Sequence, residues 1–328
     1  MHVQVELPRE EMENFLNEIT PNKDWLYLLA PFSIGDFLIA GGLSYAAQTK
    51  KNKSATVLIA QDRMKNLGIT FENVVGTIYL PIDLINAVGT FITATENYER
   101  DNFFYGNYKI GDNRAYDDSI NAVERFKRYV FDLPLATPLM PPIVNSLTAE
   151  NISALREKYI LDKNRTVILL PYAKTFDNLD VNFWVNMAKI FAEKNYIVYT
   201  NVAGDEKPIA GTTPLNVNFA ELNFIADNVK CFIGLRSGIF DFLGMTGAKI
   251  FCILKFAMWD WDIKFLYGHD NGKTFYDAVK YKKPLEDYLK SKGLPPKIEL
   301  SHPHIARSNI YFSYEDILNA IVYEVEKI

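Results

Sequence analysis

The sequence holds few of the residues that define several common classes of protein. Only two cysteines, Cys231 and Cys252, occur in 328 residues, and both lie in apolar runs. We therefore expect buried thiols in a reducing compartment, with no disulfide and no cysteine metal site. Apolar runs all fall short of the roughly 18 residues that a membrane-spanning helix needs, and the polar residues 1–22 lack the apolar segment of a secretory signal. These absences predict a cytoplasmic protein.

Positive charge and nucleotide-binding glycine motifs are also scarce. The chain has 35 Lys and Arg against 40 Asp and Glu, a net charge of −5, which predicts that nucleic acid is not a partner. No G-x-G-x-x-G follows the first strand expected in either half, which disfavours a classical dinucleotide oxidoreductase. Asp260 and Asp262 have the Asp-x-Asp spacing of some divalent-metal sites but end no convincing strand, and His302 and His304 have no partner ligands in sequence. We expect no metal and no cofactor.

Apolar runs alternate with helical patterns along both halves of the chain. Continuous apolar runs are typical of strands that are covered on both faces of a parallel sheet. Such strands are expected at residues 25–30, 55–60, 74–80, 103–110, 165–170, 196–200, 231–233 and 249–254. Helices are expected at residues 10–18, 37–49, 61–67, 81–98, 117–131, 148–159, 181–194, 219–226, 239–245 and 313–328. This alternation predicts an α/β fold of two Rossmann-like, doubly wound domains.

The composition changes at residues 132–145, which hold four of the 15 prolines. Such a segment predicts an extended, semi-rigid linker. We therefore expect one domain over residues 1–145 and another over residues 146–311, with a C-terminal helix at 312–328 that packs back on the first domain. The two domains are expected to face each other across a cleft at the carboxyl ends of their strands, where open parallel sheets bind ligands.

One short stretch stands out for its chemistry. Residues 234–241 read Gly-Leu-Arg-Ser-Gly-Ile-Phe-Asp and join an apolar strand to a helix. A strand, a tight Ser-Gly turn and a helix aim backbone N–H groups at an anion. Arg236 could then contact a phosphate with two prongs, Ser237 could cap the helix or bind an oxygen, and Gly238 could let a ligand approach closely. The alternative is an ordinary strand-to-helix turn with a surface arginine.

Several short motifs follow one another in a particular order. They are Ile34-Gly35-Asp36 after the first strand, Pro171 with Lys174-Thr175 after a later strand, Trp184 in the next helix, Gly204-Asp205-Glu206, and Ser237-Gly238. This order, which spans most of the chain, resembles the heptosyltransferase-type glycosyltransferases and implies their two-domain GT-B fold. Where that family has Asp-Ser/Thr-Gly-x-x-His, this chain reads Arg-Ser-Gly-Ile-Phe-Asp. That turn is similar to some fucosyltransferase-like GT-B proteins, in which an arginine holds the nucleotide diphosphate.

The resemblance implies that a sugar moves from a nucleotide-diphosphate sugar to a glycan or glycolipid acceptor in the synthesis of a bacterial surface polysaccharide. The transfer would invert the sugar and need no metal. The acceptor would bind the first domain near Ser33 and Gly35, with Asp36 as the base that takes its proton. The donor would bind the second domain at Lys174, Thr175, Glu206, Arg236, Ser237 and Gly238. Peripheral contact with a membrane is left open.

Each of these assignments has a plainer alternative. Asp36 can simply cap the helix that follows it, Lys174 can be a solvated loop residue, and Glu206 can be an ordinary loop charge. For the whole protein, one alternative is a non-catalytic module that binds a sugar nucleotide or a glycan. Another is a sugar-nucleotide epimerase on the same fold, for which the loops offer few carboxylates.

Overall fold

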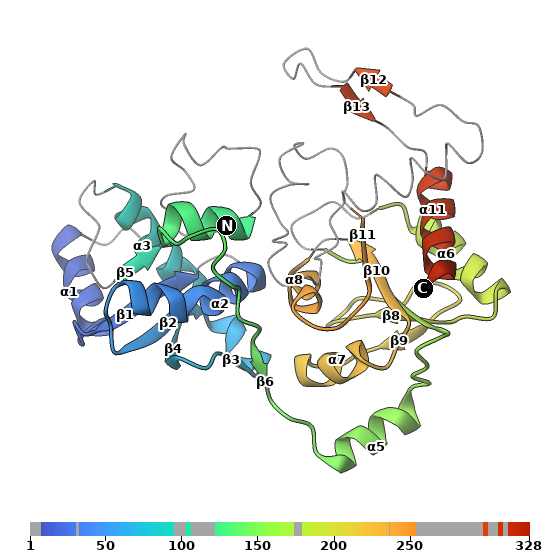
Figure 1. Cartoon of the computed structure of the whole chain (residues 1–328), viewed down its shortest axis with the longest axis horizontal. Coiled ribbons are helices and arrows are strands. Elements are labelled where there is room, and N and C mark those ends of the chain that lie inside the picture. The colour runs from blue at the N-terminus through green and yellow to red at the C-terminus, as the bar shows by residue number, and fades with distance from the viewer. Residues whose placement is uncertain are drawn as a thin grey trace. The chain divides into compact units, whose positions relative to one another are not determined.

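A computed structural model describes residues 8–30, 33–94, 103–105, 122–173, 179–235, 237–253, 298–300, 308–310 and 314–328 (Figure 1). The described residues belong to two compact units, of which the first lies within Met1–Ser146 and the second begins at Leu147. This division falls one residue from the boundary that the sequence predicts between residues 145 and 146. Each unit has its own parallel sheet and its own hydrophobic core.

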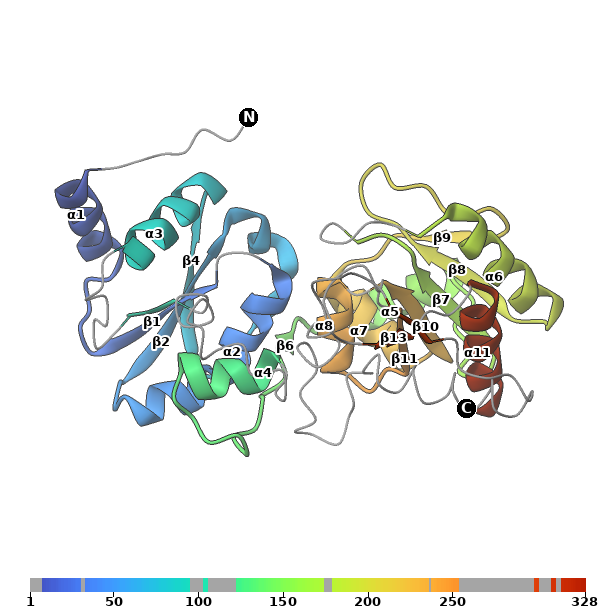
Figure 2. The same cartoon turned by 90° about the horizontal axis from the view of Figure 1, so that it is seen from above.

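The first unit is built on four parallel strands in the order β4-β2-β1-β5. Its elements are α1 (Arg9–Ile19), β1 (Trp25–Ala30), α2 (Ile34–Lys50), β2 (Ala55–Gln61), η1 (Asp62–Leu67), β3 (Ile69–Thr70), β4 (Val74–Leu80), α3 (Ile82–Ala94), β5 (Phe103–Tyr105), α4 (Ala122–Arg125), η3 (Phe126–Val130) and β6 (Ile143–Val144). Side chains alternate across β1, so Tyr27 and Leu29 join the core beneath α1 and α3. Leu28 is buried toward the other face, which α2 covers (Figure 2).

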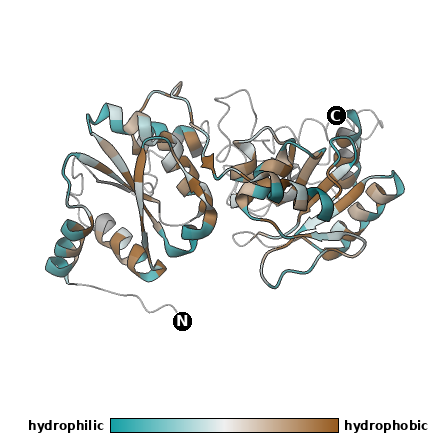
Figure 3. Ribbon diagram, turned by 90° about the horizontal axis from the view of Figure 1, so that it is seen from below, coloured by the Kyte–Doolittle hydropathy of each residue, from teal (hydrophilic) through white to brown (hydrophobic). Residues whose placement is uncertain are grey.

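The second unit is built on five parallel strands in the order β11-β10-β7-β8-β9. Its elements are α5 (Ala149–Lys158), β7 (Thr166–Leu170), α6 (Val181–Glu193), β8 (Ile197–Asn201), β9 (Thr213–Leu215), α7 (Phe219–Ala226), β10 (Cys231–Leu235), α8 (Gly238–Gly244), β11 (Ile250–Ile253), β12 (Ile298–Leu300), β13 (Ser308–Ile310) and α11 (Tyr314–Lys327). β7 and β10 are buried along their whole length. Accordingly, the central strands are among the most hydrophobic segments of the molecule (Figure 3).

The expectation that the C-terminal helix returns to the first unit is wrong. α11 packs beside α6, and its Leu318, Ile321 and Val325 join the core that α6 forms with β7 and β10. Lys194, which follows α6, also pairs with Glu326 of α11 at 2.5 Å. The spacing of apolar residues shows that this helix has a face to bury. It does not show which surface receives that face, because the receiving surface is formed by residues far away in the sequence.

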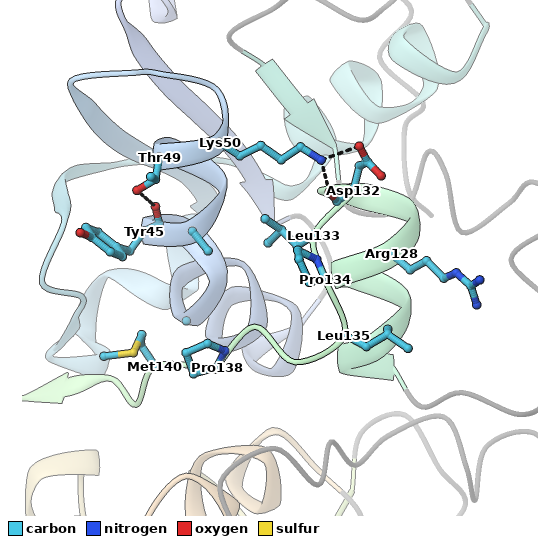
Figure 4. Close-up of a pocket in the computed structure, with 12 residues that line it drawn as sticks. Tyr45, Thr49, Lys50, Arg128, Asp132, Leu133, Pro134, Leu135, Pro138 and Met140 are labelled. Carbon is cyan, nitrogen blue, oxygen red and sulfur yellow. Dashed lines mark hydrogen bonds and ion pairs between the residues drawn. The ribbon is translucent and has the colours of Figure 1, made fainter.

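Residues 133–145, which we call the strap, lie in the proline-rich segment for which the sequence predicts an extended, semi-rigid linker, and they pack on the first unit (Figure 4). Its Leu133 and Leu139 are buried against the first unit. The Met140 N–H donates to the carbonyl of Gly42 in α2 at 2.9 Å, and β6 pairs with β3. Gly42 permits this approach, because a Cβ there would lie 2.6 Å from the Leu139 side chain. Burial of the two leucines and pairing of the backbone hold the strap on the first unit.

Two expectations based on absences can be compared with the fold. Cys231 is fully buried in β10, as the sequence predicts. Burial raises the pKa of its thiol to about 12, so the thiol stays protonated and unreactive at neutral pH. Among the helices that the structure describes, none combines the length and the apolar composition needed to cross a membrane.

Candidate functional site

Both sheets reverse their strand order beside their first strand. In the first unit the chain passes from β1 to β2 and β4 on one side, and then to β5 on the other. In the second unit it passes from β7 to β8 and β9, and then to β10 and β11 on the opposite side. Ligands of open parallel sheets bind outside the carboxyl ends of the strands at such a reversal point. A ligand is therefore expected beside the residues that follow β1, β7 and β10.

In the second unit, the β10–α8 turn lies at the reversal point. Gly234 packs tightly against β7, because a Cβ there would lie 2.2 Å from the carbonyl oxygen of Leu170. Ser237 is the N-cap residue of α8, with φ −154° and ψ 171°. Within the described part of the chain, no cap hydrogen bond reaches the Ser237 side chain. Asp241, in the first turn of α8, is only 4% exposed.

The loops after β7 and β8 meet at the same edge of the sheet. The Tyr172 hydroxyl donates to the carbonyl of Lys207 at 2.5 Å. Burial, and then the negative charge of Glu206, raises the pKa of Tyr172 above the ordinary phenol value. Tyr172 is absent from the site that the sequence predicts. Its position directly after the strand that ends at Leu170 is the signal that could have identified it.

The Glu206 carboxylate forms a hydrogen bond within its own loop, the one that follows β8. Its Oε2 accepts the Ala203 N–H at 2.9 Å, and the Glu206 N–H donates to the Ala203 carbonyl at 3.2 Å. Gly204 turns the chain between them with a positive φ of 59°. The side chain is half-buried beside Tyr172 and lies at the predicted edge of the sheet. Its role toward a ribose stays a prediction, as does the alternative of an ordinary loop charge.

In the first unit, the turn after β1 leads into α2. Ser33 is the N-cap residue, and its Oγ accepts the Asp36 N–H at 3.2 Å. The Ser33 hydroxyl also donates to Asp36 Oδ2 at 3.0 Å. The cap of α2 is therefore Ser33 and not Asp36, whose carboxylate lies on the first turn and is half-buried. Gly35 is buried between them.

Other predicted site residues lie outside the described residues. They are Lys174, Thr175 and Arg236, and the same holds for the rejected metal candidates Asp260, Asp262, His302 and His304. Among the residues that are described, no group of three His, Cys, Asp or Glu side chains could hold a metal ion. The structure thus brings Ser33, Gly35 and Asp36 together in the first unit. In the second unit it brings Glu206 beside Tyr172 on the edge where Ser237 and Gly238 also lie.

Each group has a distinct chemical capacity. The first N–H groups of a helix lack intrahelical acceptors, so the turn at Ser237 and Gly238 can offer N–H and hydroxyl donors to an anion. The Asp36 carboxylate can accept a proton from a hydroxyl group, and Ser33 fixes its orientation. One edge is thus suited to a negatively charged ligand and the other to a ligand with hydroxyl groups.

Comparison with known proteins gives a fold but no sequence family. No family model matches the chain, and no curated protein matches its sequence. Among solved structures, the ADP-heptose LPS heptosyltransferase II of E. coli matches with a TM-score of 0.54 at 12% identity, covering 92% of this chain and 98% of the other. A glycosyl transferase family 9 protein of Veillonella parvula matches with a TM-score of 0.52 at 9% identity, covering 94% and 98%.

These matches cover nearly the whole of each chain, so the likeness concerns the complete two-unit architecture. At such low identity the likeness establishes the fold, which is the GT-B fold of heptosyltransferase-like glycosyltransferases. The fold class predicted from the alternation of strands and helices is confirmed. Fold alone does not assign an activity, because unrelated chemistry recurs on shared folds.

Proposed function

We propose that this protein is a glycosyltransferase that moves a sugar from a nucleotide-diphosphate sugar to a glycan or glycolipid acceptor. The observation that carries the proposal is the coincidence of chemistry and topology. The hydrogen-bonded pair Ser33 and Asp36 follows β1, and the Ser237–Gly238 turn follows β10. Both lie beside the points where the strand order of the two sheets reverses. The two structural matches, an LPS heptosyltransferase and a glycosyl transferase, support a bacterial surface polysaccharide as the product.

The donor binds the second unit in this proposal. Arg236, Ser237 and Gly238 hold the diphosphate, with Lys174 and Thr175 adding contacts from the loop after β7. A guanidinium and N–H donors can neutralise the charge that develops on the leaving diphosphate, so the reaction needs no metal. Glu206 accepts hydrogen bonds from the ribose, and Tyr172 supports this loop through its bond to the Lys207 carbonyl.

The acceptor binds the first unit, where Asp36 acts as the general base. An acceptor hydroxyl oxygen forms a bond to the anomeric carbon of the sugar as the bond from that carbon to the diphosphate oxygen breaks. The hydroxyl proton goes to the Asp36 carboxylate, and the nucleoside diphosphate leaves with the bonding electron pair. Attack opposite the leaving group inverts the anomeric centre. Ser33 orients the base, and Gly35 lies beside it at the start of α2.

A non-catalytic binding module is the second candidate, and one observation favours it. The Ser33 hydroxyl donates to Asp36 Oδ2 at 3.0 Å, and the Asp36 N–H donates to the Ser33 oxygen. Together these bonds give Asp36 a structural role at the start of α2. A carboxylate in the first turn of a helix also stabilises that helix through the helix dipole, by about 0.3–1 kcal/mol. This structural role alone would explain why an aspartate stands at position 36, without any part in catalysis.

The substitution Asp36→Asn separates the two candidates. Asn keeps the size of the side chain but cannot take the acceptor's proton. General-base catalysis typically contributes about 10²–10⁴-fold, so we expect sugar transfer to fall by that amount while nucleotide affinity stays near normal. A matched control is Asp83→Asn, which removes an acidic residue from the first turn of α3. Transfer by Asp36→Asn at the wild-type rate would refute the base assignment, and binding of donor without transfer by the wild type would favour the module.

A further inference from the structure

One buried polar side chain of the second unit stands without a hydrogen bond. Asn201, the last residue of β8, is only 8% exposed. Within the described part of the chain, no hydrogen bond reaches its carboxamide. Other buried polar side chains nearby are paired, since the Thr166 hydroxyl donates to the Ile160 carbonyl at 2.8 Å and the hydroxyls of Thr200 and Thr212 share a hydrogen bond of 2.6 Å. A buried amide without a partner costs free energy, which points to a ligand as the missing partner.

Asn201 lies at the carboxyl edge of the sheet, where open parallel sheets bind ligands. β7 and β8 both end there, with Leu170 next to Asn201 in register, and β10 pairs Gly234 with Leu170. Two strand spacings therefore separate Asn201 from Gly234, which is about 10 Å. The turn at Ser237, proposed above to bind the diphosphate, begins three residues after Gly234. A nucleoside spans a similar distance between its base and its phosphates, so one nucleotide can contact both places.

An aromatic ring is fixed at the same edge. Tyr172 comes two residues after the end of β7, and its hydroxyl donates to the Lys207 carbonyl at 2.5 Å. The ring therefore reaches from the end of β7 to the loop that begins directly after Asn201. The bond from the Ala203 N–H to the Glu206 carboxylate, at 2.9 Å, closes that loop. A half-buried ring that is held at its hydroxyl offers a rigid face, on which a flat base can stack.

We propose that the Asn201 carboxamide pairs with the edge of the donor's nucleobase while the Tyr172 ring stacks on its face. The inference rests on the proposed function, in which the second unit binds a nucleotide sugar, and it names the residue that determines which nucleotide binds. A carboxamide offers an acceptor and donors side by side, so it pairs with a base edge that presents the complementary groups. Stacking accepts every base, because each has a π-face. Asn201 thus supplies specificity, and Tyr172 supplies affinity.

Titration calorimetry with ADP, GDP, UDP and CDP measures the preference for a base. The wild-type chain should bind one of the four at least about fivefold more tightly than the weakest, because a pairing of two hydrogen bonds discriminates between bases to that extent. Asn201→Leu should weaken binding of the preferred diphosphate about fivefold and bring the four affinities within about twofold of one another. Tyr172→Leu should weaken all four about fivefold and keep the order of preference, since it removes stacking alone.

Thermal melting without nucleotide separates a ligand-binding amide from a structural one. Leu is close to Asn in size and has no polar atoms, so Asn201→Leu removes a buried amide that breaks no described hydrogen bond. This variant should melt at or above the wild-type temperature. The matched control is Asn228→Leu, at the opposite edge of the sheet between α7 and β10, where the amide donates to the Phe224 carbonyl at 2.7 Å. The control should melt below the wild type and keep the wild-type preference for a base.

Several outcomes would overturn the proposal. One is equal affinity of the wild-type chain for all four diphosphates, and another is a preference that Asn201→Leu retains. A marked fall in the melting temperature of both Asn201→Leu and the smaller Asn201→Ala would show that the amide is structural. These three results leave nucleotide binding itself intact, so they contradict this inference alone. Failure of the wild-type chain to bind any of the diphosphates would instead refute the proposed donor site, and this inference with it.

Discussion

Two serines begin helices after central strands of the two units, Ser33 after β1 and Ser237 after β10, yet they make different contacts with their helices. Ser33 and Ser237 both follow a buried central strand, and their backbones are nearly identical, with φ −146° and ψ 166° against φ −154° and ψ 171°. Ser33 accepts the Asp36 N–H and donates to the Asp36 carboxylate. As far as the structure is described, Ser237 makes no cap hydrogen bond at all.

The third helical residue accounts for one of the two bonds. In α2 that residue is Asp36, whose carboxylate accepts the Ser33 hydroxyl, whereas in α8 it is Phe240, which is fully buried and has no side-chain acceptor. The acid of α8 comes one position later, at Asp241, which is buried. The side chain of Ser33 therefore caps α2, whereas the side chain of Ser237 makes no described cap hydrogen bond with α8. We interpret the second as the better place for an anionic ligand.

The largest expected effect concerns β10, the strand that leads to Ser237. Gly234→Ala adds a Cβ that would lie 2.2 Å from a backbone oxygen of Leu170, and a neighbouring central strand cannot move away. We expect a loss of about 3 kcal/mol in the free energy of unfolding, measured by urea denaturation. Gly76→Ala in the edge strand β4 is the control, because no described atom lies within 4 Å of its Cβ. Equal stability of the two variants would show that the β7–β10 contact is misplaced.

The next effect concerns Arg236, which precedes Ser237, the cap residue of α8. A two-pronged contact between a guanidinium and a phosphate typically contributes about 1.5–3 kcal/mol, so Arg236→Ala should weaken nucleoside diphosphate binding about tenfold or more. Arg236→Lys should restore little, because an ammonium cannot reproduce the planar fork. Titration calorimetry measures both affinities. Unchanged affinity in a folded Arg236→Ala protein would mean that the turn does not bind the diphosphate.

The smallest effect compares the two serines directly. Ser33→Ala removes a working cap and should lower the free energy of unfolding by about 1 kcal/mol. Ser237→Ala removes no described cap bond and should change stability by less than about 0.5 kcal/mol, while weakening the binding of a nucleoside diphosphate. Thermal melting and titration calorimetry on both variants provide the measurements. An equal loss of stability in Ser33→Ala and Ser237→Ala would contradict the claim that only Ser33 caps its helix through its side chain.

Much of the fold could be predicted from local pattern. The strand expected at residues 25–30 is β1, the one expected at 74–80 is β4, and the helix at 219–226 is α7. These elements are readable because continuous apolar runs and helical spacing are local properties. The start of α2 was predicted less well, because the helix is expected from residue 37 with Asp36 as a possible cap, whereas it begins at Ile34 with Ser33 as the cap.

Features that depend on distant partners could not be predicted. The pairing of β3 with β6 involves two residues in each strand, and neither run is long enough to show a period. The strap is rich in proline like a linker, but Leu133 and Leu139 find a surface on α2 that only the folded unit creates. The destination of α11 was mistaken for the same reason. The hydrogen bond from Tyr172 to the loop after β8 joins residues 35 positions apart, so no local pattern shows it, although the position of Tyr172 after β7 does mark it as a candidate.

Nucleotide binding by the wild-type chain tests the account most directly. Thermal melting is measured with a panel of nucleoside diphosphates, with their sugar conjugates, and with the matching nucleoside monophosphates as controls. A ligand at a hundred times its dissociation constant adds about 2.7 kcal/mol of stability, which corresponds to a rise of roughly 5–10 °C in the melting temperature. The account predicts such a rise with at least one diphosphate and a smaller one with its monophosphate. No shift with any diphosphate or sugar nucleotide would contradict it.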